Sequence, residues 1–163
     1  MIVLVSDTCI LIDLERGGLL EAAFSCGFTM VVPDLIYDRE LADENGPYLR
    51  SLGLGVVTLT PEEVELAQQA QTKRPTLSLP DCFALSCAHR VDHALVSGDK
   101  NLRSEAKARK VIIYGLLWLL DEMEQAGIPP KTLHTGLQMI ESHPRCRLPK
   151  DEIKTRLAKW SGT

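Results

Sequence analysis

The sequence has no excess of positive charge. Lys and Arg number 18 against 22 Asp and Glu, which gives a formal net charge of -4. A chain without a global basic field holds a polyanion such as a nucleic acid only through local basic patches or bound cations. Aromatic side chains are also scarce, at 5% of the residues, so any recognition of a nucleic acid would rest on shape and backbone more than on base stacking.

Cysteine and histidine patterns typical of disulfides or zinc sites are missing. The five cysteines are odd in number, lie in apolar segments and include no Cys-x-x-Cys pair: Cys9, Cys26, Cys82, Cys87 and Cys146. They are predicted to be reduced, buried small residues. Of the four histidines, His89 and His93 are four residues apart but are expected on different elements. The sequence therefore argues against a zinc site.

No apolar run is long enough to cross a membrane. The first five residues are apolar, but Asp7, Asp13 and Glu15 follow closely, and no leading positive charge or small-residue cleavage site indicates a signal peptide. There is no internal repeat and no low-complexity segment. With 45% hydrophobic residues, the chain suffices for one domain over residues 1–163. We expect a cytoplasmic protein.

The apolar run at the start stops at a carboxylate. Residues 1–5 are too continuously apolar for a half-exposed strand, which predicts a strand covered on both faces of a parallel sheet. Asp7 follows this strand and enters a helical pattern. In open α/β sheets ligands bind at that edge. The alternative is that Asp7 only caps the helix by accepting a backbone N–H bond.

Strands and helices alternate along the rest of the chain. Further strands are predicted near residues 28–32, 56–59, 94–96 and 111–113. Helices are predicted near 33–44, 60–72, 81–90 and 115–125, with two more near 131–142 and 149–160. This order predicts an α/β fold with a central, mostly parallel five-stranded sheet flanked by helices. The helices from about residue 129 are expected to pack on it.

Three further acids stand at positions that could face the same sheet edge. Asp99 follows the fourth predicted strand, and Asp81 lies in the first turn of a helix with a small, apolar face. At about 100° per residue, Glu40 falls between Ile36 and Tyr37 on the inner side of its helix. Capping explains Asp81 and Asp99 equally well, and Glu40 could be an ordinary solvated acid.

Four gathered carboxylates would repel one another unless a cation neutralised them. Carboxylates with retained waters are the ligands that Mg²⁺ or Mn²⁺ prefers. The arrangement therefore predicts a divalent cation site.

Several segments, in order, resemble PIN-domain ribonucleases, most nearly the VapC-type toxins of toxin–antitoxin pairs. They read SDTCILIDL, VPDLIYDRELADE, LSLPDCFALSCA and LVSGDKNLRSEA, followed by YGLLWLLDEMEQAGIPP. The resemblance implies a three-layer PIN-like fold and a catalytic, metal-binding quartet of Asp7, Glu40, Asp81 and Asp99. It also implies that Ser97 is the hydroxyl before the last acid. Cys9 departs from the pattern, since many relatives have Asn or Ser there.

The implied reaction is the hydrolysis of RNA phosphodiester bonds by a water activated by Mg²⁺ or Mn²⁺. Basic side chains at helical spacing are candidates for holding the RNA: Lys100, Arg103, Lys107 and Lys110, with Lys73 and Arg74 in a loop expected to be exposed. These side chains could equally form an ordinary solvated surface.

The resemblance also implies a partner, an antitoxin whose Arg or Lys would occupy the acidic cleft. Leu14 and Leu41 are the exposed apolar residues on which the hydrophobic anchors of its tail are expected to land, and a homodimer is a further expectation. Two other functions remain open. One is a haloacid-dehalogenase-like phosphohydrolase with Asp7 as nucleophile, although such sites usually have a second acid where Cys9 stands. The other is a non-catalytic PIN-like binding module.

Overall fold

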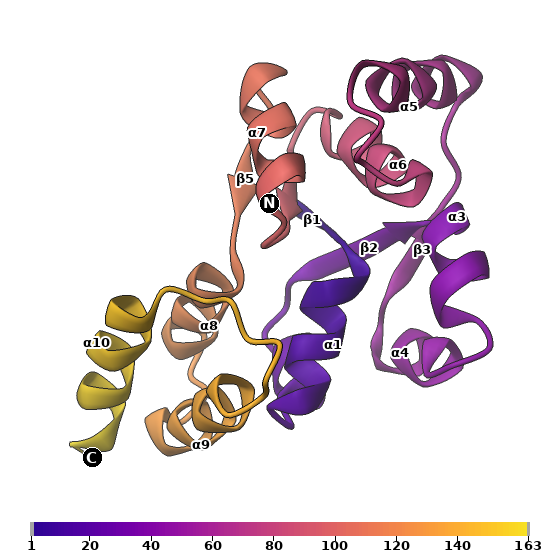
Figure 1. Cartoon of the computed structure of the whole chain (residues 1–163). Helices are drawn as coiled ribbons and strands as arrows, with labels where there is room; N and C mark the ends of the chain where they lie inside the picture. The colour runs from indigo at the N-terminus through magenta and orange to yellow at the C-terminus, as the bar shows by residue number, and fades with distance from the viewer. Residues whose placement is uncertain (1, 163) are drawn as a thin grey trace.

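One parallel sheet organises the fold. In the computed structural model, which describes residues 2–162, the strands are β1 (Val3–Ser6), β2 (Thr29–Pro33), β3 (Gly55–Val57), β4 (His93–Val96) and β5 (Ile113–Tyr114). They form a five-stranded sheet in the order β3-β2-β1-β4-β5, and every neighbouring pair is parallel (Figure 1). The predicted sheet is confirmed.

Helices connect the strands. They are α1 (Thr8–Arg16), α2 (Leu20–Phe24), α3 (Asp34–Ile36), the π-helix η1 (Tyr37–Leu41), α4 (Gly46–Leu52), α5 (Pro61–Lys73), α6 (Leu79–Ala88), α7 (Lys100–Ala108), α8 (Leu116–Gln125), α9 (Pro130–Glu141) and α10 (Lys150–Ser161). α5, α6 and α7 lie on one side of the sheet, and α1 with α8, α9 and α10 lies on the other (Figure 1). The chain therefore has the three layers of an α/β fold.

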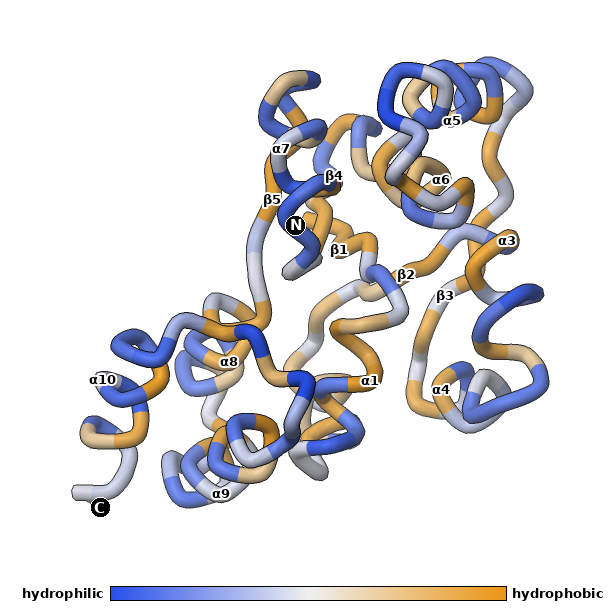
Figure 2. The backbone as a smooth tube through the Cα atoms, viewed as in Figure 1, coloured by the Kyte–Doolittle hydropathy of each residue, from blue (hydrophilic) through white to orange (hydrophobic). Residues whose placement is uncertain are grey.

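The core lies on both faces of the central strands. Leu4, Val5, Leu95 and Val96 are all buried, as expected for a parallel sheet covered by helices on each side. Figure 2 shows the same distribution, with hydrophobic strands inside and hydrophilic stretches on the outer helices. On the far side α9 packs against α1, and α10 packs against α9.

Leu14 and Leu41, which the sequence predicted as exposed anchors for a partner, are part of this core. Leu14 is 0% exposed and Leu41 is 3% exposed. Their positions on α1 and η1 face the interior because both elements bury their apolar side against neighbouring elements. The prediction that they are exposed is wrong.

The acid-rich segment after β2 differs most from its prediction as one helix over residues 33–44. A short α3 is followed by η1, in which the Ala42 N–H donates to the Tyr37 carbonyl at 2.7 Å, five residues back. After a turn, α4 begins at Gly46, where the sequence predicted a break. Pro47 suits a first helical turn because its missing N–H has no partner there anyway.

The cysteines are free, as predicted, but their burial varies. Cys82 and Cys87 are buried, whereas Cys9 is exposed near the start of α1. The prediction of burial is therefore wrong for Cys9.

Within residues 2–162, no helix is both long and apolar enough to span a membrane.

Candidate metal centre

Two neighbouring strands end side by side at the carboxyl edge of the sheet. β1 pairs with β4, with Ser6 opposite Val96, and the Asp7 N–H continues the ladder by donating to the Val96 carbonyl at 3.3 Å. Asp7 and Ser97 are thus adjacent because the strands before them are in register. The chain runs outward from these strands in opposite directions, which is where open parallel sheets bind ligands.

Asp7 is a buried carboxylate held at both oxygens. Its exposed fraction is 3%. Oδ1 accepts from the Ile10 N–H at 3.0 Å, so Asp7 does cap α1, and Oδ2 accepts from the Ser97 hydroxyl at 2.5 Å. Burial raises the pKa of Asp7 to about 6, the two hydrogen bonds oppose that rise, and the charges of Asp81 and Asp99 add to it.

Ser97 links Asp7 to Asp99. Ser97 is fully buried, and its hydroxyl accepts from the Asp99 N–H at 3.1 Å while donating to Asp7. Asp99 in turn caps α7 by accepting from the Leu102 N–H at 2.8 Å. A single hydroxyl therefore fixes the first acid relative to the backbone of the last.

Asp81 approaches from α6. The N-cap of this helix is Ser78, whose hydroxyl accepts from the Asp81 N–H at 3.1 Å. Burial raises the pKa of Asp81, its interaction with Ser78 lowers it, and the charges of Asp99 and Glu40 raise it further. Asp81 is therefore in the same negative field as Asp7, Asp99 and Glu40.

Glu40 lies at the outer margin of this group. It is exposed, so the prediction that it points into the protein is wrong as derived, because π-helical hydrogen bonding replaces the 100° spacing on which it rested. Its Oε2 nevertheless accepts from the Thr8 hydroxyl at 2.9 Å. This contact ties η1 to the start of α1 beside Asp7.

Thr8 is a site residue that the sequence reading missed. Its position directly after Asp7 at a helix start was the available signal, but that position is also ordinary for a threonine. Cys9 comes next, and partial desolvation of its thiol together with the charge of Asp7 raises its pKa to about 11. These surroundings favour the protonated thiol.

The basic residues predicted to grip RNA are in different situations. Lys100 and Lys107 are exposed on α7. Arg103 donates from Nη1 to the Ser97 carbonyl at 3.0 Å, so it holds the backbone next to the acids. Lys110 lies beyond the end of α7 with φ at 60° and does not continue the helical face.

Lys73 and Arg74, expected in an exposed basic loop, both pair with a buried acid, Glu105. Arg74 is therefore not free to bind RNA. Lys73 keeps an exposed side chain, but it ends α5 instead of lying in a loop.

The acids at the sheet edge have no basic ion-pair partner among the residues that the structure describes. Within residues 2–162, the ion pairs that Lys, Arg and His side chains form involve none of Asp7, Glu40, Asp81 and Asp99. Uncompensated carboxylates in a shared, partly buried site attract an external cation.

The donor set fits Mg²⁺ or Mn²⁺ in one particular way. In the described part of the chain no three His, Cys, Asp or Glu side chains stand close enough to form a ready-made metal cage. Mg²⁺ seldom uses such a cage, because it keeps several waters and binds through one or two carboxylates plus substrate phosphates. Each Asp7 oxygen accepts one hydrogen bond and so retains a lone pair for a cation.

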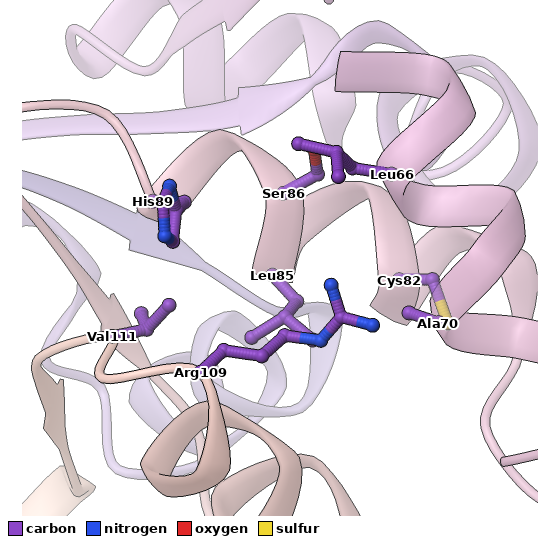
Figure 3. A pocket seen from close by; sticks show the side chains of 8 residues that line it. All are labelled: Leu66, Ala70, Cys82, Leu85, Ser86, His89, Arg109 and Val111. Carbon is purple, nitrogen blue, oxygen red and sulfur yellow. The ribbon is translucent and has the colours of Figure 1, made fainter. Parts of the chain in front are cut away.

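A cavity of about 250 Å³ lies elsewhere, between α5, α6 and the end of α7 (Figure 3). Its lining includes Leu66, Cys82, Leu85, His89 and Arg109, and none of the four acids. It is mostly apolar and separate from the carboxylates, so the candidate chemistry belongs to the sheet edge.

Comparison with known proteins identifies the family of the chain. A family model described as a PIN domain matches residues 3–162, almost the whole chain. No curated protein matches the chain. PIN domains are in general metal-dependent nucleases, and the parallel sheet with acids at its carboxyl edge is a nuclease-type fold of that kind. The chain belongs to the PIN-domain family.

Proposed function

We propose that this chain is an endoribonuclease that hydrolyses RNA phosphodiester bonds with Mg²⁺ or Mn²⁺. One or two of Asp7, Asp81 and Asp99 would bind the ion directly, the others would bind through its retained waters, and Glu40 would act from the margin of the site. The observation that carries the proposal is Asp7, a carboxylate only 3% exposed that no Lys, Arg or His among the described residues neutralises.

The side chains around the acids have distinct tasks. A bound Mg²⁺ or Mn²⁺ would lower the pKa of its water and neutralise charge on the phosphate. Ser97 and the Ile10 N–H hold Asp7 in one orientation and favour its ionised form. Thr8 orients Glu40, and Arg103 fixes the backbone at Ser97. The protein supplies no nucleophile of its own.

An RNA cleavage assay tests the proposal. With Mg²⁺ or Mn²⁺ the protein should cut an end-labelled oligoribonucleotide, and EDTA should stop it. Asp7→Asn should lower the rate by at least about 100-fold, the scale of removing one group that stabilises charge in a transition state. Because Asn caps helices as well as Asp, α1 should stay intact.

Asp13→Asn on the same helix is the matched control. Asp13 pairs with Arg16 at 3.6 Å and is not one of the proposed ligands, so the variant should cleave RNA like the parent. Cleavage that persists in EDTA, or that survives Asp7→Asn, would refute the proposal.

The same samples separate the other two functions. A phosphoaspartate at Asp7 after incubation with an aryl phosphate and Mg²⁺ would support the phosphohydrolase. RNA binding without cleavage under every metal condition would support the binding module.

We propose that the RNA backbone contacts Lys100 and Lys107, exposed cations of α7 that form no ion pair with any acid in residues 2–162. Replacing both with Ala should weaken RNA binding and flatten its salt dependence by up to about 1.4 in the log–log slope, 0.7 per phosphate contact on a single strand. Lys131→Ala with Lys154→Ala, on α9 and α10, is the control. If both double variants have the same log–log slope of RNA affinity against salt, Lys100 and Lys107 do not contact the RNA and belong to an ordinary solvated surface.

We further propose that the protein is the toxin of a toxin–antitoxin pair. An Arg or Lys of a partner's tail would pair with the acids in place of the metal ion. Because Leu14 and Leu41 are buried, the exposed Ile12 of α1 (38%) replaces them as the apolar contact. Mg²⁺ titrated into the purified complex should release the partner and restore cleavage. Inhibition that does not change with Mg²⁺ would place the partner elsewhere.

A further inference from the structure

A buried acid on α7 is surrounded by three basic side chains. Glu105 is 0% exposed. Its Oε1 lies 2.8 Å from Arg74 Nε, and its Oε2 lies 2.7 Å from Arg109 Nε and 3.6 Å from Lys73 Nζ. Burial would raise the pKa of Glu105, but the hydrogen bond from Arg109 and the neighbouring positive charges outweigh it and lower the pKa. Glu105 is therefore an ionised buried acid outside the metal centre.

The basic partners come from two different places. Arg109 follows α7 itself and pairs with Glu105 one helical turn away. Lys73 ends α5, and Arg74 is the first residue of the connector to α6. The pair between Glu105 and Arg74 therefore joins two elements, whereas the pair with Arg109 stays on one.

The connector from Arg74 to α6 is short and internally fixed. The Leu77 N–H donates to the Arg74 carbonyl at 3.0 Å, and Leu77 is 2% exposed, so its side chain anchors the turn in the core. Ser78 follows at once and caps α6 through the Asp81 N–H. Arg74 is thus joined to Asp81 by a short segment in which Leu77 and Ser78 are both held by these contacts.

The helix that carries Glu105, α7, starts at Asp99, and the Asp99 side chain caps it. Glu105 lies within the same helix, so the position of Glu105 and the position of Asp99 are tied by regular helical geometry. The acids at the two helix starts repel each other, because the charge of Asp99 acts directly on Asp81. The attractive pair of Glu105 and Arg74 joins the same two segments that carry these acids.

We propose that Glu105 is a positioning residue for the metal centre. By pairing with Arg74 across the α5–α6 connector, it sets the separation between Asp81 and Asp99. This inference rests on the proposed function only in that the two acids share a cation.

The experiment compares two arginines that pair with the same carboxylate. Arg74→Gln removes the charge that joins the connector to α7. Arg109→Gln removes a charge of the same kind on α7 itself, beside the cavity (Figure 3). Both leave buried Glu105 with one cation fewer, so a merely structural role predicts similar losses of thermal stability and no difference at the metal centre.

Two readouts follow the site. In metal-free protein, amide hydrogen exchange at Asp81 should lose protection in Arg74→Gln and keep it in Arg109→Gln. Titration with Mn²⁺ should give an affinity about tenfold weaker in Arg74→Gln, the lower end of the effect of removing an outer-shell partner. Arg74→Lys, which keeps the charge, should recover part of both losses.

The outcomes are separable. If the parent binds no Mn²⁺, the proposed function fails. The hydrogen-exchange data still decide whether the Glu105–Arg74 pair fixes the position of Asp81. If Arg74→Gln and Arg109→Gln have the same Asp81 protection and the same Mn²⁺ affinity, the inference is overturned and Glu105 only stabilises the fold.

Discussion

Ser97 donates one hydrogen bond, which is buried, to Asp7 and accepts another, which is half-buried, from the Asp99 N–H. Ser97→Ala would leave Asp7 Oδ2 without that donor. Because this hydrogen bond lowers the pKa of Asp7, its loss should raise that pKa above about 6. The pH at which Mn²⁺ affinity reaches half its maximum should then move upward, and stability should fall by about 1–3 kcal/mol.

Ser86→Ala is the control for that prediction. Ser86 is also a buried serine, and its hydroxyl donates to the Glu63 carbonyl at 2.7 Å, away from the acids. It should cost comparable stability and leave the pH midpoint of Mn²⁺ binding in place. An unchanged midpoint in Ser97→Ala as well would mean that Ser97 does not act on Asp7.

Asp7 should make stability depend on pH in an unusual direction. Its folded pKa of about 6 exceeds the ordinary 3.8, so between these values the folded chain holds the proton more tightly. The contribution is therefore fully present below about pH 4 and is lost as pH rises through about 6. Without metal, Asp7→Asn should be more stable than the parent at pH 8, by on the order of 3 kcal/mol, with the difference vanishing near pH 4.

Glu63 provides a control of opposite sign. Hydrogen bonding from Arg90 lowers the pKa of Glu63 to about 2 despite partial burial, so its contribution is present above its ordinary pKa and is lost as pH falls through about 2. Thermal unfolding of Glu63→Gln should therefore show a loss of stability at neutral pH. If the melting temperatures of the parent and of Asp7→Asn change in parallel between pH 4 and pH 8, the assigned pKa of Asp7 is contradicted.

At the scale of elements, local patterns predicted most of what positions the acids. The apolar runs that precede Asp7 and Asp99 are strands, and α5 starts with a capping box of Thr60 and Glu63, close to the predicted helix start. These features depend on a few neighbouring residues. Arg74 could not be placed in this way, because its partner Glu105 lies far along the chain and nothing nearby indicates it.

The π-helix η1 could not be predicted from the local sequence either, because its hydrogen-bond pattern occurs together with a close approach between η1 and α4. A Cβ on Gly46 would lie 2.5 Å from the Leu41 carbonyl oxygen, so only glycine permits the contact between the start of α4 and the end of η1. Glu40 is exposed because it lies in this π-helical segment, where the period of an α-helix does not apply.

Gly46→Ala should therefore displace η1. We expect a loss of about 1–3 kcal/mol from overpacking, together with weaker Mn²⁺ affinity because Glu40 moves away from Thr8. Gly136→Ala, whose Cβ would lie 2.6 Å from the Leu19 side chain, is the control. It should lower the melting temperature similarly while leaving Mn²⁺ affinity alone. Equal Mn²⁺ affinity in both variants would exclude Glu40 from the site.

At the scale of the whole molecule, strand order explains why acids distant in the sequence meet. β1 lies between β2 and β4, so the segments after these strands converge on one edge, and α6 crosses above β1 and β4 to bring Asp81 there. The net charge of -4 means that the molecule does not attract RNA by its overall field. Contact with a phosphate backbone would therefore depend on local charges, namely the cation proposed at this edge and the exposed Lys100 and Lys107 of α7.

The most direct test of this account is a calorimetric titration of Mn²⁺ into the RNA-free protein at pH 7.5. We predict binding in the parent and in Asp13→Asn, and a loss of at least about tenfold in affinity in both Asp7→Asn and Asp99→Asn, since each removes a ligand from one shared site. Asn keeps both helix caps, so unfolding should not account for the loss. Mn²⁺ affinity that is the same in the parent, Asp7→Asn and Asp99→Asn would show that these acids only cap their helices.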